Sequence, residues 1–278
     1  MGSNIEILIS TYNGAQYLRE QLNSLFSQTY HNFKILIRDD GSNDNTIQIV
    51  KEFAAQYSNK INLIEDDFGN LGSSISFMKL LEYSVSDYVM FCDQDDVWLP
   101  NKIEVTLRKI QEMEEEGFDQ PLLVFSDLKV VDNELKIIND SFWSYQKIDP
   151  NIASNWKDLA AQNVITGCTI MFNKEAKNCC LPFELPFLLH DQWTGVCVSK
   201  AGKVGFIEEK TLLYRQHNRN VAGAQNYGIK YLYSKINELR NSIKYYKSAS
   251  KYFKEVSVFE LLYKKVKINL IRVFNFKV

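Results

Sequence analysis

Residues 91–98 place three carboxylates, Asp93, Asp95 and Asp96, within four positions. They follow an apolar run at residues 88–91 that predicts a buried strand. Carboxylates held close together repel one another, so a fold that gathers them at a strand end usually supplies a cation. A divalent metal between carboxylates and a diphosphate can stabilise a phosphate leaving group. The alternative is an acidic turn in which Asp96 caps the following helix.

Two further polar clusters interrupt apolar runs nearer the start of the chain. Residues 11–14 read Thr-Tyr-Asn-Gly, and residues 39–42 read Asp-Asp-Gly-Ser. An aspartate there can accept a hydrogen bond from a pyrimidine N3–H or a ribose hydroxyl, and Gly41 permits a tight turn. An ordinary connection from strand to helix produces the same pattern.

A third cluster, at residues 189–193, contains His190, Asp191 and Trp193 at a predicted helix start. A carboxylate in this setting can act as a general base for a hydroxyl if burial raises its pKa. The alternative is that Asp191 only caps the helix.

The last clusters lie near residues 166 and 215. His217 could bind a metal through a neutral ring nitrogen, and Arg215 or Arg219 could bind diphosphate oxygens as a fork. A solvated polar loop is the alternative. Gly167 either lets the backbone approach a sugar or phosphate, or forms a turn before a strand.

Alternating strands and helices must position these clusters. Apolar runs predict strands at residues 5–10, 33–38, 61–64 and 88–92, and helical spacing predicts helices at residues 15–28, 46–57 and 74–83. This alternation favours a mainly parallel sheet covered on both faces, with ligands beyond the carboxyl ends of the strands. The clusters at residues 11–13, 39–42 and 93–96 therefore meet along one edge.

The second half of the chain has a less regular pattern. We predict helices at residues 101–116 and 190–200, and strands at 122–127, 169–172, 203–207 and 211–214. Residues 139–156 are aromatic and irregular. Beyond residue 227 two amphipathic helices are expected, divided near residues 256–257. We therefore divide the chain into a body, residues 1–225, and a basic helical tail, residues 226–278.

The composition fits a folded globular protein with one large domain, or one domain and an appendage: 278 residues, 45% hydrophobic and 24% charged. We expect no membrane-spanning segment and no signal peptide, because the first residues lead straight into a strand pattern. The five cysteines form no paired framework and no CxxC spacing. They indicate reduced residues in a cytoplasmic protein.

The charge is distributed unevenly. Residues 227–278 contain ten Lys and two Arg against three Glu and no Asp, a net charge of +9 that leaves −11 for the rest. Basic helices with interleaved aromatic residues can lie on an anionic bilayer, whereas the acidic body argues against nucleic acid. The alternative is a tail packed on the body or on a second subunit, which leaves a homodimer open.

Six of these stretches, taken together and in order, resemble the family 2 glycosyltransferases with a GT-A fold. The resemblance is closest to the bacterial rhamnosyltransferase-like branch, which builds surface polysaccharide, and it covers roughly residues 4–221. The matching stretches are residues 9–14, 38–46, 93–98, 166–168, 190–193 and 214–217.

The resemblance implies a role for each matching residue. Asp191 matches the catalytic base, and His190 stands where the family more often has Glu. Asp93 and Asp95 match the DxD element, with Asp95 and His217 on Mn²⁺ or Mg²⁺. Donor contacts fall to Thr11, Tyr12, Asn13, Asp39, Asp40, Asp93, Gln94 and Arg215, and acceptor contacts to His190 and Trp193.

The resemblance also implies the reaction. A sugar would move with inversion from a nucleotide-diphosphate donor, dTDP-rhamnose or a UDP-hexose, to a glycan acceptor carried on a polyprenyl diphosphate. The tail would hold this cytoplasmic enzyme at the inner face of the plasma membrane. The residues also bear on two alternative functions. A nucleotidyltransferase usually has a basic phosphate loop, which residues 11–14 lack, and the complete acidic set argues against a catalytically silent sugar-nucleotide-binding module.

Overall fold

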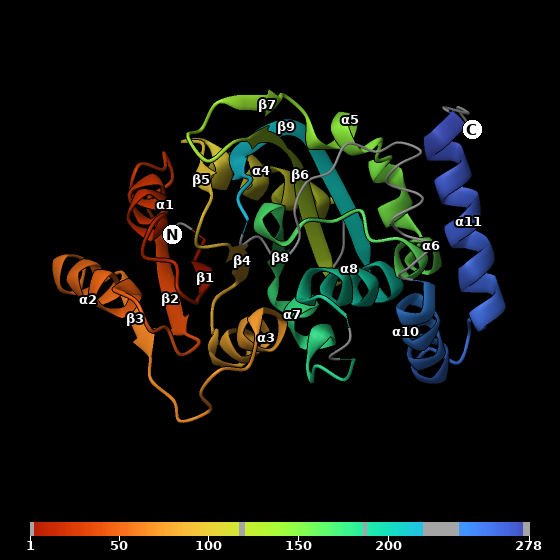
Figure 1. Ribbon diagram of the computed structural model, residues 1–278, viewed down its shortest axis with the longest axis horizontal. Coiled ribbons are helices and arrows are strands. Elements are labelled where there is room, and N and C mark those ends of the chain that lie inside the picture. Colours follow the sequence, from red (N-terminus) through yellow and green to blue (C-terminus); the bar gives the residue numbers. More distant parts are fainter. Residues whose placement is uncertain (1–2, 117–119, 186–187, 219–238, 275–278) are drawn as a thin grey trace.

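A single mixed sheet forms the centre of the computed structural model, which describes residues 3–116, 120–185, 188–218 and 239–274 (Figure 1). Its strands follow the order β3-β2-β1-β4-β8-β6-β9-β5, and β7 pairs with β6. The strands are β1 (Ile5–Thr11), β2 (Phe33–Asp39), β3 (Ile61–Ile64), β4 (Tyr88–Cys92), β5 (Val97–Trp98), β6 (Leu122–Val131), β7 (Ile137–Asn139), β8 (Met171–Asn173) and β9 (Lys203–Arg215).

The two halves of the sheet differ in strand direction. From β3 to β4 every pairing is parallel, as predicted. Beyond β4 the sheet is mixed, because β8 runs antiparallel between β4 and β6 while β6 and β9 are parallel. The two short strands predicted at residues 203–207 and 211–214 are one continuous strand, β9, whose pairing with β6 spans the polar residues between them.

Helices cover both faces of the sheet (Figure 1). Alternate residues of β1 point to opposite faces, so Ile5, Ile7 and Ile9 join one buried cluster and Leu8 joins the other. The first face is covered by α1 (Leu18–Phe26), α2 (Thr46–Gln56) and α4 (Lys102–Glu115). The second is covered mainly by α3 (Ser73–Tyr83), α6 (Trp156–Ala161), α7 (Lys174–Cys180) and α8 (His190–Ala201).

The segment expected to be irregular, residues 139–156, is instead mostly helical. It forms α5 (Phe142–Gln146) and the 3₁₀ turn η1 (Pro150–Ser154), and it leads into α6. Ser141 caps α5 by accepting from the Ser144 amide, and Asn155 caps α6 by accepting from the Lys157 amide. Side-chain caps of this kind stabilise helices too short to show a hydrophobic period.

The C-terminal helices, α10 (Leu239–Tyr252) and α11 (Val258–Phe274), pack at the end of the molecule beside α6 and α8 (Figure 1). Their division near residues 256–257 confirms the predicted pair. Tyr246, Phe253 and Leu261 belong to the same buried cluster as the body. The predicted boundary between residues 225 and 226 lies outside the described residues. Within the described residues, no helix has both the length and the apolar character to cross a membrane.

Candidate functional site

The predicted polar clusters meet at the carboxyl edge of the parallel strands. β1 lies between β2 and β4, and this change in strand order is where open α/β sheets bind ligands. A cavity of about 580 Å³ opens there. Among its lining residues are Tyr12, Asp40, Asp93, Gln94, Asp95, Gly167, His190 and Asp191. The cavity thus unites clusters that are separated by up to 180 positions in the sequence.

The Asp39 carboxylate joins the loops that follow β1 and β2. The Thr11 hydroxyl donates to its Oδ1 over 2.8 Å, and the Ser42 amide donates to its Oδ2 over 2.8 Å. Thr11 is fully buried. Thr11 and Asp39 therefore lie at this edge of the sheet with their side chains bonded to each other, but neither lines a cavity, and their contact with a donor stays a prediction.

Asp40 lines the cavity but has a buried cation as its partner. Its Oδ1 lies 2.5 Å from Arg38 Nη1, and the backbone amides of Leu71 and Gly72 donate to its two oxygens over 2.8 Å. Arg38 also pairs with Asp66 at 2.8 Å, and this bond lowers the pKa of Asp66. The Arg38 network was missed in the sequence, although a lone arginine inside an apolar strand was a signal for it.

Gln94 and the loop after β1 hold one another. The Gln94 side chain accepts from the Tyr12 amide and donates to the Tyr12 carbonyl, both over 2.9 Å. Asn13 supports the same loop by accepting from the Asn43 amide over 2.8 Å. A Cβ on Gly14 would lie 2.1 Å from Gln94 Oε1, so this close approach requires glycine. The Tyr12 ring is 47% exposed and is free to contact a ligand.

The two predicted metal ligands are in direct contact. His217 Nε2 lies 2.9 Å from Asp95 Oδ2, and the His217 ring stacks on Tyr17 at 4.8 Å between centroids. Both ligands line a second cavity of about 450 Å³ that shares Tyr12, Gln94 and Asp95 with the first. A carboxylate suits both Mn²⁺ and Mg²⁺, whereas an imidazole ligand suits a transition-metal ion such as Mn²⁺ better than Mg²⁺. If Asp95 and His217 both bind the ion, the contact between His217 Nε2 and Asp95 Oδ2 must be replaced by contacts with the ion.

A second group of possible ligands lies deeper. Asp93, Asp96 and Cys168 have ligand atoms within 4.8 Å of one another. Asp96 is fully buried, and among the described residues its Oδ2 has no hydrogen-bond partner. Burial raises the pKa of both the Asp96 carboxyl and the Cys168 thiol, which favours their neutral forms. Because a thiol suits softer metals, the Asp95–His217 pair fits a hard divalent cation better.

Asp93 points into the first cavity and titrates unusually. Burial, followed by the charges of Asp95 and Asp191, raises its pKa to about 7. A bound cation would favour the ionised form and offset this shift. Asp93, Asp95 and Asp191 line the same cavity, and the charges of the other two act on Asp93.

Arg215 is hydrogen-bonded to the loop after β4, which carries Asp95. Its Nε donates to the Asp95 carbonyl over 2.9 Å, its Nη1 donates to the Asn133 carbonyl over 2.8 Å, and Glu20 pairs with its Nη2. The side chain is 3% exposed and lines neither cavity. A direct contact with a diphosphate stays a prediction. Arg219, the other predicted candidate, lies outside the described residues.

Asp191 is buried in the wall of the first cavity near Asp93. Burial raises its pKa to about 6, and bonds from Gln192, Gly167 and Asn163 oppose that rise. The Gly167 amide donates to Oδ2 over 3.1 Å and Asn163 Nδ2 to Oδ1 over 3.2 Å. These donors are neutral. The carboxylate is therefore fixed in orientation and remains a good proton acceptor at neutral pH.

His190 lies beside Asp191 in an aromatic environment. Its ring stacks on Phe77 at 4.3 Å and meets Phe91 edge-on at 4.8 Å. Burial lowers its pKa to about 3, so the imidazole is neutral. Among the described residues, neither ring nitrogen has a hydrogen-bond partner. A buried, unpaired imidazole at a cavity wall is suited to bind a polar group of a ligand.

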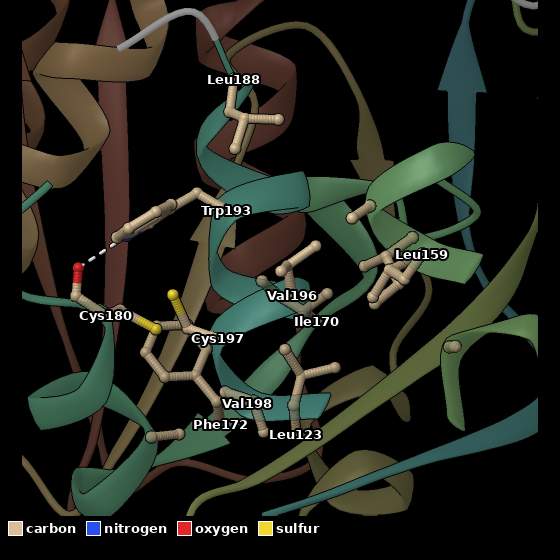
Figure 2. Packing of buried hydrophobic residues seen from close by; sticks show 14 of the residues in the cluster. Leu123, Leu159, Ile170, Phe172, Cys180, Leu188, Trp193, Val196, Cys197 and Val198 are labelled. Atoms are coloured by element: carbon tan, nitrogen blue, oxygen red, sulfur yellow. Dashed lines mark hydrogen bonds between the residues drawn. The ribbon is translucent and has the colours of Figure 1, made fainter. Parts of the chain in front are cut away.

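Trp193 requires a correction. We predicted that it stacks on an acceptor sugar, but it is 1% exposed and does not line either cavity. Its indole Nε1 donates to the Cys180 carbonyl over 2.7 Å, and its ring packs against Phe183 and Phe253. Figure 2 shows it on the inner side of α8, where it forms part of the core. One helical turn separates the wall residue His190 from core residues of the same helix.

Comparison with known proteins agrees with this geometry. Residues 6–177 match the family described as glycosyl transferase family 2. The dTDP-rhamnosyl transferase RfbG of Shigella flexneri is 28% identical over 244 residues, covering 84% of this chain and 79% of that protein.

Two solved structures have the same fold. S. aureus TarS 1-349 in complex with UDP-GlcNAc aligns with a TM-score of 0.63 and 17% identity over 99% of this chain and 73% of that one. The mannosyltransferase PcManGT from Pyrobaculum calidifontis, in complex with GDP-Man and Mn²⁺, aligns with a TM-score of 0.60 and 15% identity over 90% of this chain and 65% of that one. This chain spans only 37% of another TarS chain.

The family match covers more than half of the sequence, and the strand order and cavity agree with it. The chain belongs to glycosyl transferase family 2 and has a GT-A fold.

Proposed function

We propose that the protein transfers a sugar, with inversion, from a nucleotide-diphosphate donor to a hydroxyl of a glycan acceptor. One observation carries the proposal: the buried carboxylate of Asp191 shares a single cavity with Asp93 and Asp95. A base and a candidate leaving-group site thus border the same space. The similarity to a dTDP-rhamnosyl transferase favours dTDP-rhamnose as the donor, with a UDP-hexose as the alternative.

The donor would lie along the loops after β1, β2 and β4. Tyr12 and the turn around Asp40 border the end of the cavity suited to the nucleoside, and Asp95 borders the end suited to the diphosphate. Asp95 and His217 would hold Mn²⁺ or Mg²⁺, which when bound would neutralise charge on the departing diphosphate. The structural neighbour that contains Mn²⁺ supports a divalent ion here.

The acceptor would approach Asp191. The carboxylate removes the hydroxyl proton while the hydroxyl oxygen attacks the anomeric carbon, and the bond from that carbon to the diphosphate oxygen breaks on the opposite face. The proton ends on Asp191 and the electron pair of the broken bond ends on the diphosphate. His190, held neutral, contributes one hydrogen bond to a sugar hydroxyl and takes no part in proton transfer.

The first experiment measures release of the nucleotide diphosphate from a panel of dTDP-, UDP- and GDP-sugars with Mn²⁺. We expect release from one donor, and its loss with EDTA and in Asp95→Ala. Asp140→Ala is the matched control, because that side chain is 76% exposed and its ion-pair partner among the described residues is Lys129. If a full donor panel and a mixed glycan acceptor give no release while nucleotide binding raises the melting temperature, the protein is a silent sugar-nucleotide-binding module.

We further propose that the outward faces of α10 and α11 bind an anionic bilayer and bring the enzyme to a polyprenyl-diphosphate-linked acceptor at the inner face of the plasma membrane. On α11, Phe259, Tyr263, Val266 and Leu270 form one exposed apolar row. On α10, Lys244, Lys247 and Lys251 are exposed on one face. The acidic residues nearby are paired with the body: Glu255 with Lys200 and Glu260 with Lys157.

Point substitutions test this membrane face better than deletion, because deletion would expose core contacts of Tyr246 and Phe253. We expect Phe259→Ser with Leu270→Ser to reduce sedimentation with phosphatidylglycerol vesicles about tenfold or more, since each substitution removes apolar area that the bilayer would bury. Lys79→Ser with Glu82→Ser, an ion pair at partly exposed positions of α3, is the control. Unchanged sedimentation would contradict a membrane role, and a dimer that dissociates in the variant would assign the face to a second copy of the chain.

A further inference from the structure

The C-terminal helix α10 is hydrogen-bonded to the segment that holds Asp191. The Tyr245 hydroxyl donates to the Ala160 carbonyl over 2.5 Å, and Gln192 Nε2 donates to the Tyr245 hydroxyl over 3.2 Å. The neighbouring Tyr246 hydroxyl donates to the Ala161 carbonyl over 2.8 Å. Two tyrosines of α10 thus supply donors at the last turn of α6, where helix carbonyls have no partner within the helix.

The same segment continues directly to the candidate base. α6 ends at Ala161, and two residues later Asn163 donates from Nδ2 to Asp191 Oδ1. The Asn163 carbonyl also accepts from Gln162 Nε2 over 2.9 Å. On the other side, Gln192 follows Asp191 in the chain, and its amide N–H donates to Asp191 Oδ1 over 2.6 Å. One route from Tyr245 therefore reaches the Asp191 carboxylate through Gln192 alone, and the other runs along the chain from Ala160 to Asn163.

The contacts around α6 make this connection rigid. Tyr246 is 2% exposed, and Ala249 and Phe253 of α10 are buried with it. On the outer side of α6, Lys264 of α11 pairs with Asp158 at 2.8 Å and Glu260 pairs with Lys157 at 3.1 Å. Helix α6 therefore lies between the base and both C-terminal helices, and it cannot shift without breaking contacts on each side.

We infer that Tyr245 and Asn163 are positioning residues for the candidate base, so that α10 is an integral part of the acceptor side of the site. The inference rests on the proposed function, because it needs Asp191 to be the base. It goes beyond that function in assigning catalytic importance to a helix that lines neither cavity. Small displacements of a catalytic group can lower rates strongly, so loss of these bonds reduces kcat.

The test compares three variants with the wild type in the transfer assay. We expect Tyr245→Phe to lower kcat about tenfold and leave KM for the donor unchanged, because the donor contacts come from β1, β2 and β4. Asn163→Ala lowers kcat by a similar factor. Because both act on one carboxylate, the double variant loses less than the product of the two factors. Tyr252→Phe, on the same helix and 40% exposed, is the control and keeps wild-type kcat.

The outcomes separate the two proposals. An inactive wild type would contradict the proposed function itself. An active wild type whose Tyr245→Phe variant stays within twofold in kcat would overturn the positioning role, as would factors that multiply in the double variant. Nucleotide-binding stoichiometry measures the folded fraction, so a loss of kcat that disappears after this correction also counts against the inference.

Discussion

Two aspartates line the same cavity at similar depth and have opposite surroundings. Asp40 is 2% exposed and Asp191 is 8% exposed. Asp40 is paired with the buried guanidinium of Arg38, whereas within the described part of the chain Asp191 accepts from neutral donors, among them the Gly167 amide and Asn163. Burial is therefore common to both residues, and the presence of a cation distinguishes them.

This difference predicts different roles for the two walls of the cavity, the Asp40 wall and the Asp191 wall. A buried carboxylate with a cation and two backbone amides is fully committed to holding a loop, in this case residues 66–72 against β2. A buried carboxylate without a cation has its pKa raised to about 6 and keeps affinity for a proton. We therefore expect the Asp40 side of the cavity to fix its shape, and we propose that the Asp191 side accepts a proton.

Substitution of the base tests the comparison most strongly. We expect Asp191→Asn to lower kcat about 10³-fold, because an amide cannot accept the acceptor proton, while donor affinity stays near wild type. Steady-state kinetics and calorimetric titration of the donor nucleotide measure the two quantities. A variant that keeps more than about a tenth of kcat would remove Asp191 from the role of base.

On the other wall the largest effect should be on stability. Arg38→Met removes the cation from Asp40 and Asp66 and leaves two carboxylates buried or nearly so. We expect the free energy of unfolding to fall by about 3–5 kcal/mol in chemical denaturation. As a control, Lys136→Met breaks an exposed pair with Glu134 and should cost less than about 1 kcal/mol. Equal losses in the two variants would show that Arg38 is not a structural cation.

The backbone beneath the base gives a third, smaller test. A Cβ on Gly167 would lie 2.8 Å from His190 Nε2 and 3.4 Å from the Asp191 Cβ. Gly167→Ala must therefore move His190 or the loop, and we expect kcat to fall about 10- to 100-fold with stability changed little. Kinetics with a parallel thermal melt distinguish the two effects. Wild-type kcat in this variant would mean that the His190 ring can move aside without consequence.

The sequence predicted the Asp40 wall and its surroundings better than the Asp191 wall. β3 and β4 match their predicted bounds, residues 61–64 and 88–92, because buried parallel strands are short apolar runs that end at turn residues. The polar clusters after β1, β2 and β4 then meet at one edge by topology alone. The sequence pattern did not show which charged residues pair with each other. Asp66, for example, pairs with Arg38 at a separation of 28 positions.

The Asp191 wall depends on contacts that no local pattern encodes. Asp191 was correctly placed at the start of a helix, but the same helix begins with wall residues and continues with core residues, so Trp193 was assigned to the wrong side. Helices α5 and α6 are held by caps from Ser141 and Asn155, and they are too short for periodicity to reveal them. The link from Tyr245 to this wall spans 85 positions and required the packed structure.

The smallest expected effect is on the pH dependence of kcat, which should follow the pKa of Asp191. With a pKa of about 6, raised from the ordinary value by burial, Asp191 is deprotonated and active above that pH and becomes protonated as the pH falls through it. We expect kcat, measured with saturating donor and metal, to fall about tenfold for each pH unit below this value. His190, with a pKa of about 3, contributes no limb in this range, so His190→Phe should lower kcat and leave the profile in place. A limb near pH 4 in the wild type would mean that Asp191 has the pKa of an exposed carboxylate, and the contrast between the two walls would then lose its electrostatic basis.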